Sequence, residues 1–589
     1  MKKRILSAAM LAAMLFALCA CSGKDAQKAA ATPEVNYPVA FCLGAQPKSL
    51  DPVEYAVGDD ATYLVNLCSG LVSYRTDADG VVHLTPDLCE ELPTPTTDES
   101  GKPVYAFTLR DDLKWSDGSA LTAVDLVYSW NRAAADSDAS ERDLFSCIDG
   151  FSSGKLNISA SEDGGTFTVV LDKQTPRFLQ RLTNPIFYPV KQNAVQGPGW
   201  DTDPGRSVTS GAYRLGAFSE DGMTLEKNEH YWDASNTELD TLEFAFSKDP
   251  NAILEGYQEG RYRVASSLPA GMTSELRASE GDALHVTGRM GSYSICFNMN
   301  DPALADFSEP EREQLRTALS LLIDRNAICE DIARQGQRPA NAVVPTGMTD
   351  ADGTDFSANN GAEGKGGGYF SVSAEDYESN CDRAVELLRA VAKSSGAFSV
   401  SEDGICEGFP ELTFLTSESS GHVEIANALT ECYQACGISL KTSVLDQSSF
   451  LQARANGDFS MARFSWTAAY DDPASFLLLW SAGAGSNCIG LGQDAHGSYS
   501  GYSAMIGGSK VDSLTWAEAY DALLFTIQSS TDEAQRSRCM HEAETLLMQT
   551  GAICPIYEYT GVYLCRPSFT GLYTGPSGAL YFMRAAANN

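Results

Sequence analysis

A strand pattern, a tight turn and a capped helix pattern follow one another early in the chain, and this order most limits what it can fold into. The stretch "VYAFTLR" (104–110) alternates apolar and polar side chains, as a half-buried strand does. Asp117-Gly118 marks a turn. "TAVDLVYSWNRA" comes next, with Thr122 and Asp125 at the spacing of a helix capping box. Strands that alternate with helices in this way indicate an α/β protein.

The same device recurs toward the C-terminus. Ser308 and Glu311 have capping-box spacing before a long helical pattern, and Ser530 and Glu533 have it before the helix that precedes the strand pattern "ICPIYEYTGVYLC". Because the chain has 589 residues, we predict an α/β protein of two or three domains. Stretches rich in Gly, Ser and Asp that lack periodicity are expected to be surface insertions. They are 349–376, 393–410 and 481–501.

The N-terminus indicates export. A basic "KKR" precedes residues 5–20, which are almost wholly apolar. This run is shorter than the ~20 residues that span a bilayer, so we predict a signal peptide over 1–20. The run ends in "LCAC", which resembles the bacterial lipobox and implies a diacylglycerol group on Cys21. Residues 21–36 are then a flexible tether, and the protein is expected at the outer face of the cytoplasmic membrane, anchored by lipid.

The charge balance restricts the partners. Lys and Arg number 42 against 78 Asp and Glu, which gives a formal net charge of −36 with no basic cluster. Nucleic acid is therefore not an expected partner, because phosphate binding needs clustered cations. An acidic excess of this size is typical of a solvated, mutually repelling surface. We expect a monomer.

The sequence has 16 cysteines, several of which occupy apolar patterns where a small hydrophobic residue would serve. We therefore predict mostly reduced, buried thiols. Cys432 and Cys436 lie one helical turn apart, but no matching Cys or His pair stands nearby, and the six His are scattered. Core packing is the favoured role for this pair, and neither a metal nor a cofactor is expected.

The stretch "FSWTAAYDDPASFLLLW" is the candidate functional segment. Asp471 and Asp472 would point to opposite sides of an extended chain, so they do not form an acid/base pair. Asp472 followed by Pro473 is typical of a helix start. Trp466, Tyr470 and Asp471 remain, and aromatic rings beside a carboxylate suit holding a ligand better than transforming it.

No common catalytic motif is found. The sequence contains no phosphate-binding G-x-x-x-x-G-K-[ST] loop, no H-E-x-x-H and no G-x-S-x-G. We therefore predict a binding protein and not an enzyme. A surface hydrolase that uses Asp471 or Asp472 is the remote alternative.

Five motifs occur in a fixed order along the chain. They are "QPKSLDP" (46–52), "FTLRDDLKWSDGSALTAVDLVYSWNR" (107–132), "TSGAYRLGAF" (209–218), "LRTALSLLIDRNAI" (315–328) and "GDFSMARFSWTAAYDDPASF" (457–476). Together they resemble the extracellular solute-binding proteins of peptide ABC transporters, the oligopeptide-binding type of solute-binding family 5. The resemblance extends over nearly the whole chain after the signal peptide.

This resemblance implies an α/β fold of the type II periplasmic-binding-protein kind, in which two lobes close over a ligand and an extra domain is inserted. The predicted division names three parts. They are lobe I (37–71, 188–288 and 562–589), the inserted domain (72–187) and lobe II (289–561).

The resemblance also implies a peptide ligand, delivered to membrane permease subunits that work with a separate cytoplasmic ATPase. Peptide binders of the family commonly carry an Asp that pairs with the ligand's α-amino group, and here that position is Ala469. A blocked peptide, glycopeptide, oligosaccharide or metal complex is therefore the alternative ligand. The predicted ligand-binding residues are Arg463, Trp466, Thr467, Ala468, Ala469, Tyr470 and Asp471.

Overall fold

The computed structural model describes residues 40–57, 61–77, 80–361, 364–493, 500–506 and 509–587. The predicted signal peptide, the tether and Cys21 lie outside these residues. Among the helices described, none is both long enough and apolar enough to cross a membrane.

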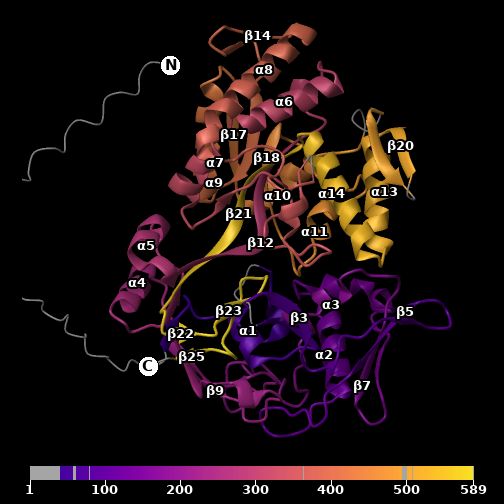
Figure 1. Cartoon of the computed structure of the whole chain (residues 1–589), viewed down its shortest axis with the longest axis vertical. Coiled ribbons are helices and arrows are strands. Elements are labelled where there is room, and N and C mark those ends of the chain that lie inside the picture. The colour runs from indigo at the N-terminus through magenta and orange to yellow at the C-terminus, as the bar shows by residue number, and fades with distance from the viewer. Residues whose placement is uncertain are drawn as a thin grey trace, which may run out of the picture. The chain divides into compact units, whose positions relative to one another are not determined.

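Eleven strands of the described residues form one large mixed sheet (Figure 1). Ten of them follow the order β17-β16-β18-β12-β21-β11-β1-β10-β9-β8, and β13 pairs with β21. Their bounds are β1 Ala40–Cys42, β8 Tyr213–Phe218, β9 Gly222–Lys227, β10 Thr241–Ala245, β11 Val264–Ser266, β12 Leu284–Phe297, β13 Arg338–Pro339, β16 Leu412–Ser417, β17 Leu440–Leu445, β18 Met461–Thr467 and β21 Ile553–Cys565.

The two long strands β12 and β21 connect the two halves of this sheet. They pair antiparallel from Leu284↔Leu564 to Cys296↔Ile553. The end of β21 at Cys565 pairs with β11, whereas the later part of β12 pairs with β18. Figure 1 shows β12 and β21 running together from one lobe to the other. The described chain thus has two lobes that share a pair of continuous strands.

Helices pack on each lobe over separate hydrophobic cores. Aromatic rings dominate the core of lobe I, where Phe41 meets Phe582 at 4.7 Å between ring centroids. The helices of lobe I are α1 Thr62–Leu67, α4 Pro250–Gln258 and α5 Thr273–Glu280. Those of lobe II are α6 Glu309–Leu321, α7 Arg325–Ala327, α8 Tyr377–Ser395, α9 Ser420–Gln434, α10 Gln447–Asn456, α11 Ala474–Leu477, α13 Trp516–Ser529 and α14 Glu533–Gln549.

The inserted domain has a sheet and a core of its own. Its strands β4 (Thr96–Thr97), β5 (Pro103–Thr108), β7 (Thr166–Val170) and β6 (Ile158–Ala160) pair in that order. Its helices are α2 (Ala123–Ala135) and α3 (Phe178–Arg181). Trp130 of α2 is fully buried against Phe167 and donates its indole N–H to the Phe187 carbonyl. The boundaries that the sequence gives to the three parts stay a prediction, and their names are used as labels.

Short pairs of strands complete the fold. The pairs are β2 (Val72–Thr76) with β3 (Val82–Pro86), β14 (Ser399–Val400) with β15 (Cys406–Glu407), β19 (Tyr502–Ile506) with β20 (Ser509–Leu514), β22 (Phe569–Thr570) with β25 (Ala586–Ala587), and β23 (Tyr573–Thr574) with β24 (Leu580–Tyr581).

Two of the three predicted capping boxes are confirmed. Thr122 starts α2 and Ser308 starts α6, each with reciprocal side-chain and backbone hydrogen bonds. The prediction at Ser530 was wrong. Asp532 caps α14 by accepting the Gln535 N–H, and Ser530 instead ends α13. A carboxylate accepts the N–H groups of a first turn as well as a hydroxyl does, so Asp532 takes this role.

The expectation of three surface insertions was also wrong in part. Each segment sends side chains into the cores of lobe II: Phe356 from the first, Phe398 and Cys406 from the second, and Leu491 from the third. Asp350 is buried as well and accepts hydrogen bonds from Ser537 and His541 of α14. Long-range partners therefore hold these Gly-rich stretches.

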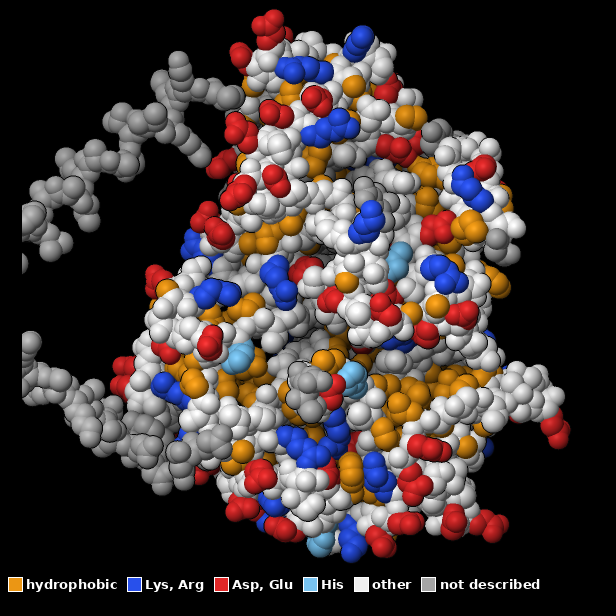
Figure 2. Space-filling model, viewed as in Figure 1, with side chains coloured by type: hydrophobic (Ala, Val, Ile, Leu, Met, Phe, Trp, Pro, Cys, Tyr) orange, Lys and Arg blue, Asp and Glu red, His pale blue; other side chains and the backbone are white. Residues whose placement is uncertain are grey.

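The described cysteines are all free thiols, buried or half-buried. No group of three or more His, Cys, Asp or Glu side chains within the described residues could hold a metal ion. On the face seen in Figure 2, acidic and basic side chains are interspersed.

Candidate functional site

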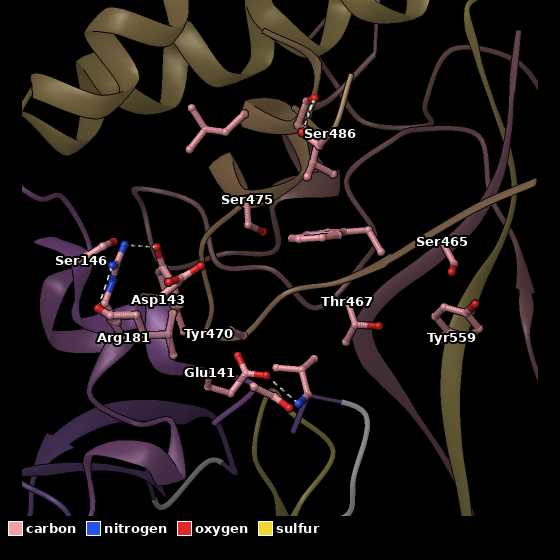
Figure 3. Close-up of a pocket in the computed structure, with 17 residues that line it drawn as sticks. Glu141, Asp143, Ser146, Arg181, Ser465, Thr467, Tyr470, Ser475, Ser486 and Tyr559 are labelled. Carbon is pink, nitrogen blue, oxygen red and sulfur yellow. Dashed lines mark hydrogen bonds between the residues drawn. The ribbon is translucent and has the colours of Figure 1, made fainter. Parts of the chain in front are cut away.

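A cavity of about 730 Å³ lies between the inserted domain and the segment of lobe II that the sequence singled out (Figure 3). Its lining is mixed, with aromatic rings, aliphatic side chains, hydroxyls and three charged groups. The lining residues are Val57, Ser140, Glu141, Asp143, Leu144, Ser146, Arg181, Ser465, Trp466, Thr467, Ala469, Tyr470, Ser475, Leu478, Leu479, Ser486 and Tyr559.

Strand β18 supplies one wall of the cavity. Its first four residues, from Met461, are buried, whereas Trp466 near its end is 38% exposed and lines the cavity. Thr467 lines the cavity too, and it pairs with Gly291 of β12. Trp466 therefore lies at the cavity and outside the core of lobe II, and its role in ligand binding stays a prediction.

Gly291 allows this wall to form. A Cβ at this position would lie 2.8 Å from Thr467 Oγ1 and 2.8 Å from a ring carbon of Tyr559, both on residues that line the cavity. Real Cβ atoms do not approach other atoms so closely, so only glycine fits here without a shift of β12 or of the Thr467 and Tyr559 side chains. The shared strands β12 and β21 and the cavity wall therefore meet at this residue.

The next lining residues meet the inserted domain. The carbonyl of Ala469 accepts a hydrogen bond from Asn184 Nδ2 at 3.2 Å. The hydroxyl of Tyr470 accepts one from Arg181 Nη2 at 2.8 Å, and the guanidinium carbon lies 5.0 Å from the ring centroid. Burial raises the pKa of Tyr470. These bonds tie the segment of lobe II to the opposite wall.

Three of the predicted site residues do not line the cavity. Ala468 is buried in the main core of lobe II, where its N–H donates to the Met290 carbonyl. Arg463 is buried earlier in β18, where its guanidinium bonds Ser417 and Gln447 and stacks over Phe450. Arg463 lies in the buried first part of β18, away from the end of the strand that lines the cavity, and Ala468 follows that end but turns into the core.

Asp471 is the third of these residues. It is 2% exposed and accepts the Thr349 N–H at 2.8 Å and the Thr349 hydroxyl. Burial raises its pKa, and the hydrogen bonds from Thr349 oppose that rise. Asp471 therefore fixes the loop at Thr349 and has no open path to the cavity.

Asp472 starts a helix, as the sequence predicts. Its Oδ1 accepts the Ala474 N–H at 3.1 Å, and α11 follows. The structure adds a buried ion pair, in which Arg536 Nη2 lies 2.7 and 2.8 Å from the two carboxylate oxygens. Because both carboxylates have structural partners, no acid/base pair is formed by Asp471 and Asp472.

Two other carboxylates do line the cavity, and sequence reasoning missed them. Asp143 belongs to the 3₁₀ helix η2 (Arg142–Cys147) of the inserted domain, and Glu141 immediately precedes that helix. Glu141 accepts the Val57 N–H at 2.9 Å, and burial raises its pKa. Asp143 is exposed at the rim. The stretch "DSDASERDLF" that contains them is mostly polar and matches no ligand-binding motif.

Comparisons with known proteins identify the family. The model of the bacterial extracellular solute-binding proteins, family 5 (middle region), matches residues 83–488. This match includes the carboxylates on one wall of the cavity and the whole of β18 and α11 on the other. The chain belongs to this solute-binding family.

Curated relatives agree with the assignment. The chain is 26% identical over 80% of its length to the dipeptide-binding protein DppE of Bacillus subtilis, covering 79% of that protein. It is 28% identical over 90% of its length to the periplasmic oligopeptide-binding protein OppA of Escherichia coli, covering 89% of that protein.

Among solved structures, the unliganded open form of the periplasmic murein tripeptide-binding protein MppA is similar in fold. The TM-score is 0.71 at 24% identity, and the match covers 93% of this chain and 97% of that one. The family 5 chain therefore has the two-lobed α/β fold with an inserted domain that the motifs imply, and its family is one of binding proteins.

Proposed function

We propose that this protein is the substrate-binding subunit of an ABC importer and captures peptides in the cavity between the inserted domain and lobe II. The cavity itself carries the proposal. Its volume of about 730 Å³ lies within the range of small-ligand sites. Both relatives named above are peptide-binding proteins by name. Trp466, Tyr470 and Tyr559 offer aromatic surface, and Ser475 Oγ has no hydrogen-bond partner in the part of the chain that the structure describes.

The same proposal includes the location of the protein and its partners in transport. Lipid on Cys21 holds it at the outer face of the cytoplasmic membrane, and two acyl chains bind a membrane stably where one does not. The loaded protein delivers its ligand to permease subunits, and a separate cytoplasmic ATPase drives uptake. It acts as a monomer.

Native mass spectrometry of protein purified without refolding tests this function. We expect the protein to carry peptide masses that are released intact on mild denaturation. Trp466→Ala should carry much less, whereas Phe525→Ala should carry the wild-type load, because Phe525 is 72% exposed on α13 and lies outside the cavity. Sugar or metal-complex masses would favour the alternative ligand, and a ligand returned cleaved would favour the hydrolase.

A further inference from the structure

The three charged residues of the cavity differ in how many partners they have within the protein. Arg181 is its cationic lining residue, and both of its terminal nitrogens have partners: Nη2 donates to Tyr470 and Nη1 to the Leu144 carbonyl. Its Nε is buried and has no hydrogen-bond partner among the described residues. The guanidinium therefore already binds Tyr470 on the opposite wall and the Leu144 carbonyl on its own wall.

Glu141 and Asp143 have fewer partners than Arg181. Glu141 is half-buried and accepts one backbone hydrogen bond, from Val57. Neither Glu141 nor Asp143 forms an ion pair with any described residue. Figure 3 shows Glu141 on the side of the cavity away from Ser475. A carboxylate that has lost water but has no cation beside it favours the approach of a positive group.

The opposite wall suits a cation as well. Trp466 exposes its indole there, and Tyr470 and Tyr559 add two phenol rings. Aromatic faces attract ammonium and guanidinium groups, indole most strongly. Ala469 provides no charge on that wall. An anionic group would meet two carboxylates and one cation, Arg181, whose terminal nitrogens already donate to Tyr470 and Leu144.

We propose that Glu141, with Asp143 at the rim, receives the positively charged group of the ligand, an ammonium or a guanidinium. The proposal rests on the proposed function and assigns its specificity. Ala469 alone suggests a ligand without a free amine, because the usual Asp is absent from that position. Under this proposal a carboxylate of the inserted domain takes the place of that Asp. The cation has two possible sources in a peptide, the α-amino group and the side chain of Lys or Arg.

Three tetrapeptide libraries distinguish the outcomes. The first has free α-amino groups and no Lys or Arg, the second is the same library N-acetylated, and the third is N-acetylated with one Lys per peptide. Each is incubated with protein stripped of ligand, and retained peptides are quantified by mass spectrometry. We expect the wild type to retain the first or the third library at least tenfold better than the second, and the better of the two names the source of the cation.

Glu141→Gln should reduce this preference about tenfold, because its amide oxygen still accepts the Val57 N–H while the charge is gone. Asp143→Asn should reduce it less. Asp138→Asn, an exposed carboxylate outside the cavity, is the matched control and should leave the preference intact. Should Glu141→Gln fail to fold, the wild type is tested in high salt. The preference should then be lost, and a preference that persists in full would overturn the ionic contact.

Two results would overturn the inference while the function stands: equal retention of all three libraries by the wild type, or a full preference in folded Glu141→Gln. Retention of none of the libraries would instead overturn peptide binding itself, and the inference with it.

Discussion

Trp466 and Trp480 stand on one short segment in different surroundings. Trp466 is 38% exposed in the cavity, and Trp480 is 1% exposed in the core of lobe II, 4.8 Å from Phe464 between ring centroids. Trp466→Ala should weaken peptide binding by about 2 kcal/mol, as truncation of an aromatic contact residue does, and lower the free energy of unfolding by about 1 kcal/mol or less. Trp480→Ala should lower that free energy by ~3–5 kcal/mol. Urea denaturation and calorimetric titration check both, and a large loss of stability in Trp466→Ala would return this residue to the core.

Glu544 is fully buried on α14 and accepts the Val344 N–H at 2.8 Å. Burial raises its pKa from 4.5 to about 7. Since the folded state holds the proton more tightly, this residue's contribution to stability is complete below pH 4.5 and is lost as the pH rises to about 7. The loss is about 3 kcal/mol at 1.36 kcal/mol for each pKa unit.

Glu544→Gln keeps an acceptor for Val344 but cannot ionise. We expect its unfolding free energy, measured by urea denaturation between pH 4.5 and 8, to lack this decline. Glu431→Gln, an exposed carboxylate on α9, should follow the wild type. Parallel curves for wild type and Glu544→Gln would show that Glu544 does not titrate in this window.

At the scale of elements, Gly291 couples β12 to the cavity wall. Gly291→Ala must push β12 away from Thr467 or Tyr559, so we expect peptide binding to weaken about tenfold and the free energy of unfolding to fall by ~1–3 kcal/mol. Gly421→Ala is the control, because nothing lies within 4 Å of a Cβ added there on α9. If calorimetry and denaturation give the two variants the same peptide affinity and the same free energy of unfolding, a Cβ at position 291 does not clash as we infer.

Capping residues predicted the start of a helix correctly where only one candidate cap was present. Thr122 and Ser308 each had their capping partner three residues on, and both helices start there. Ser530 failed because Asp532, two residues later, competes for the same role. The stretch after Thr349 was taken for a surface insertion because the partners that bury Asp350, Ser537 and His541, lie far along the chain.

At the scale of the whole molecule, the fold could be predicted from ordered motifs, but only one wall of the site could. Trp466 and Tyr470 are brought to the cavity by a strand that the sequence marks. Glu141 and Asp143 reach it because the inserted domain packs against lobe II, and no pattern near them records that contact. Asp471 was misplaced for the same reason, since its partner Thr349 is distant in sequence.

Arg177 joins the inserted domain to lobe II beside this cavity. It adopts a left-handed backbone conformation at φ 57°, which is uncommon for a residue with a side chain. Its guanidinium reaches Glu533 at 3.1 Å and the carbonyls of Thr349 and Asp350. These three partners compensate for the strained backbone of Arg177, and we infer that they hold the two walls of the cavity together.

Arg177→Gln should therefore populate a more separated arrangement of the lobes when no ligand is bound. Apparent affinity falls by the fraction of molecules that remain competent to bind, and we expect a loss of about threefold to tenfold. Small-angle X-ray scattering should give a larger radius of gyration for the empty variant and the wild-type value once peptide is bound. Arg383→Gln removes an exposed ion pair within α8 and should change neither quantity. Identical scattering of empty Arg177→Gln and wild type would mean that Arg177 does not set the separation of the lobes.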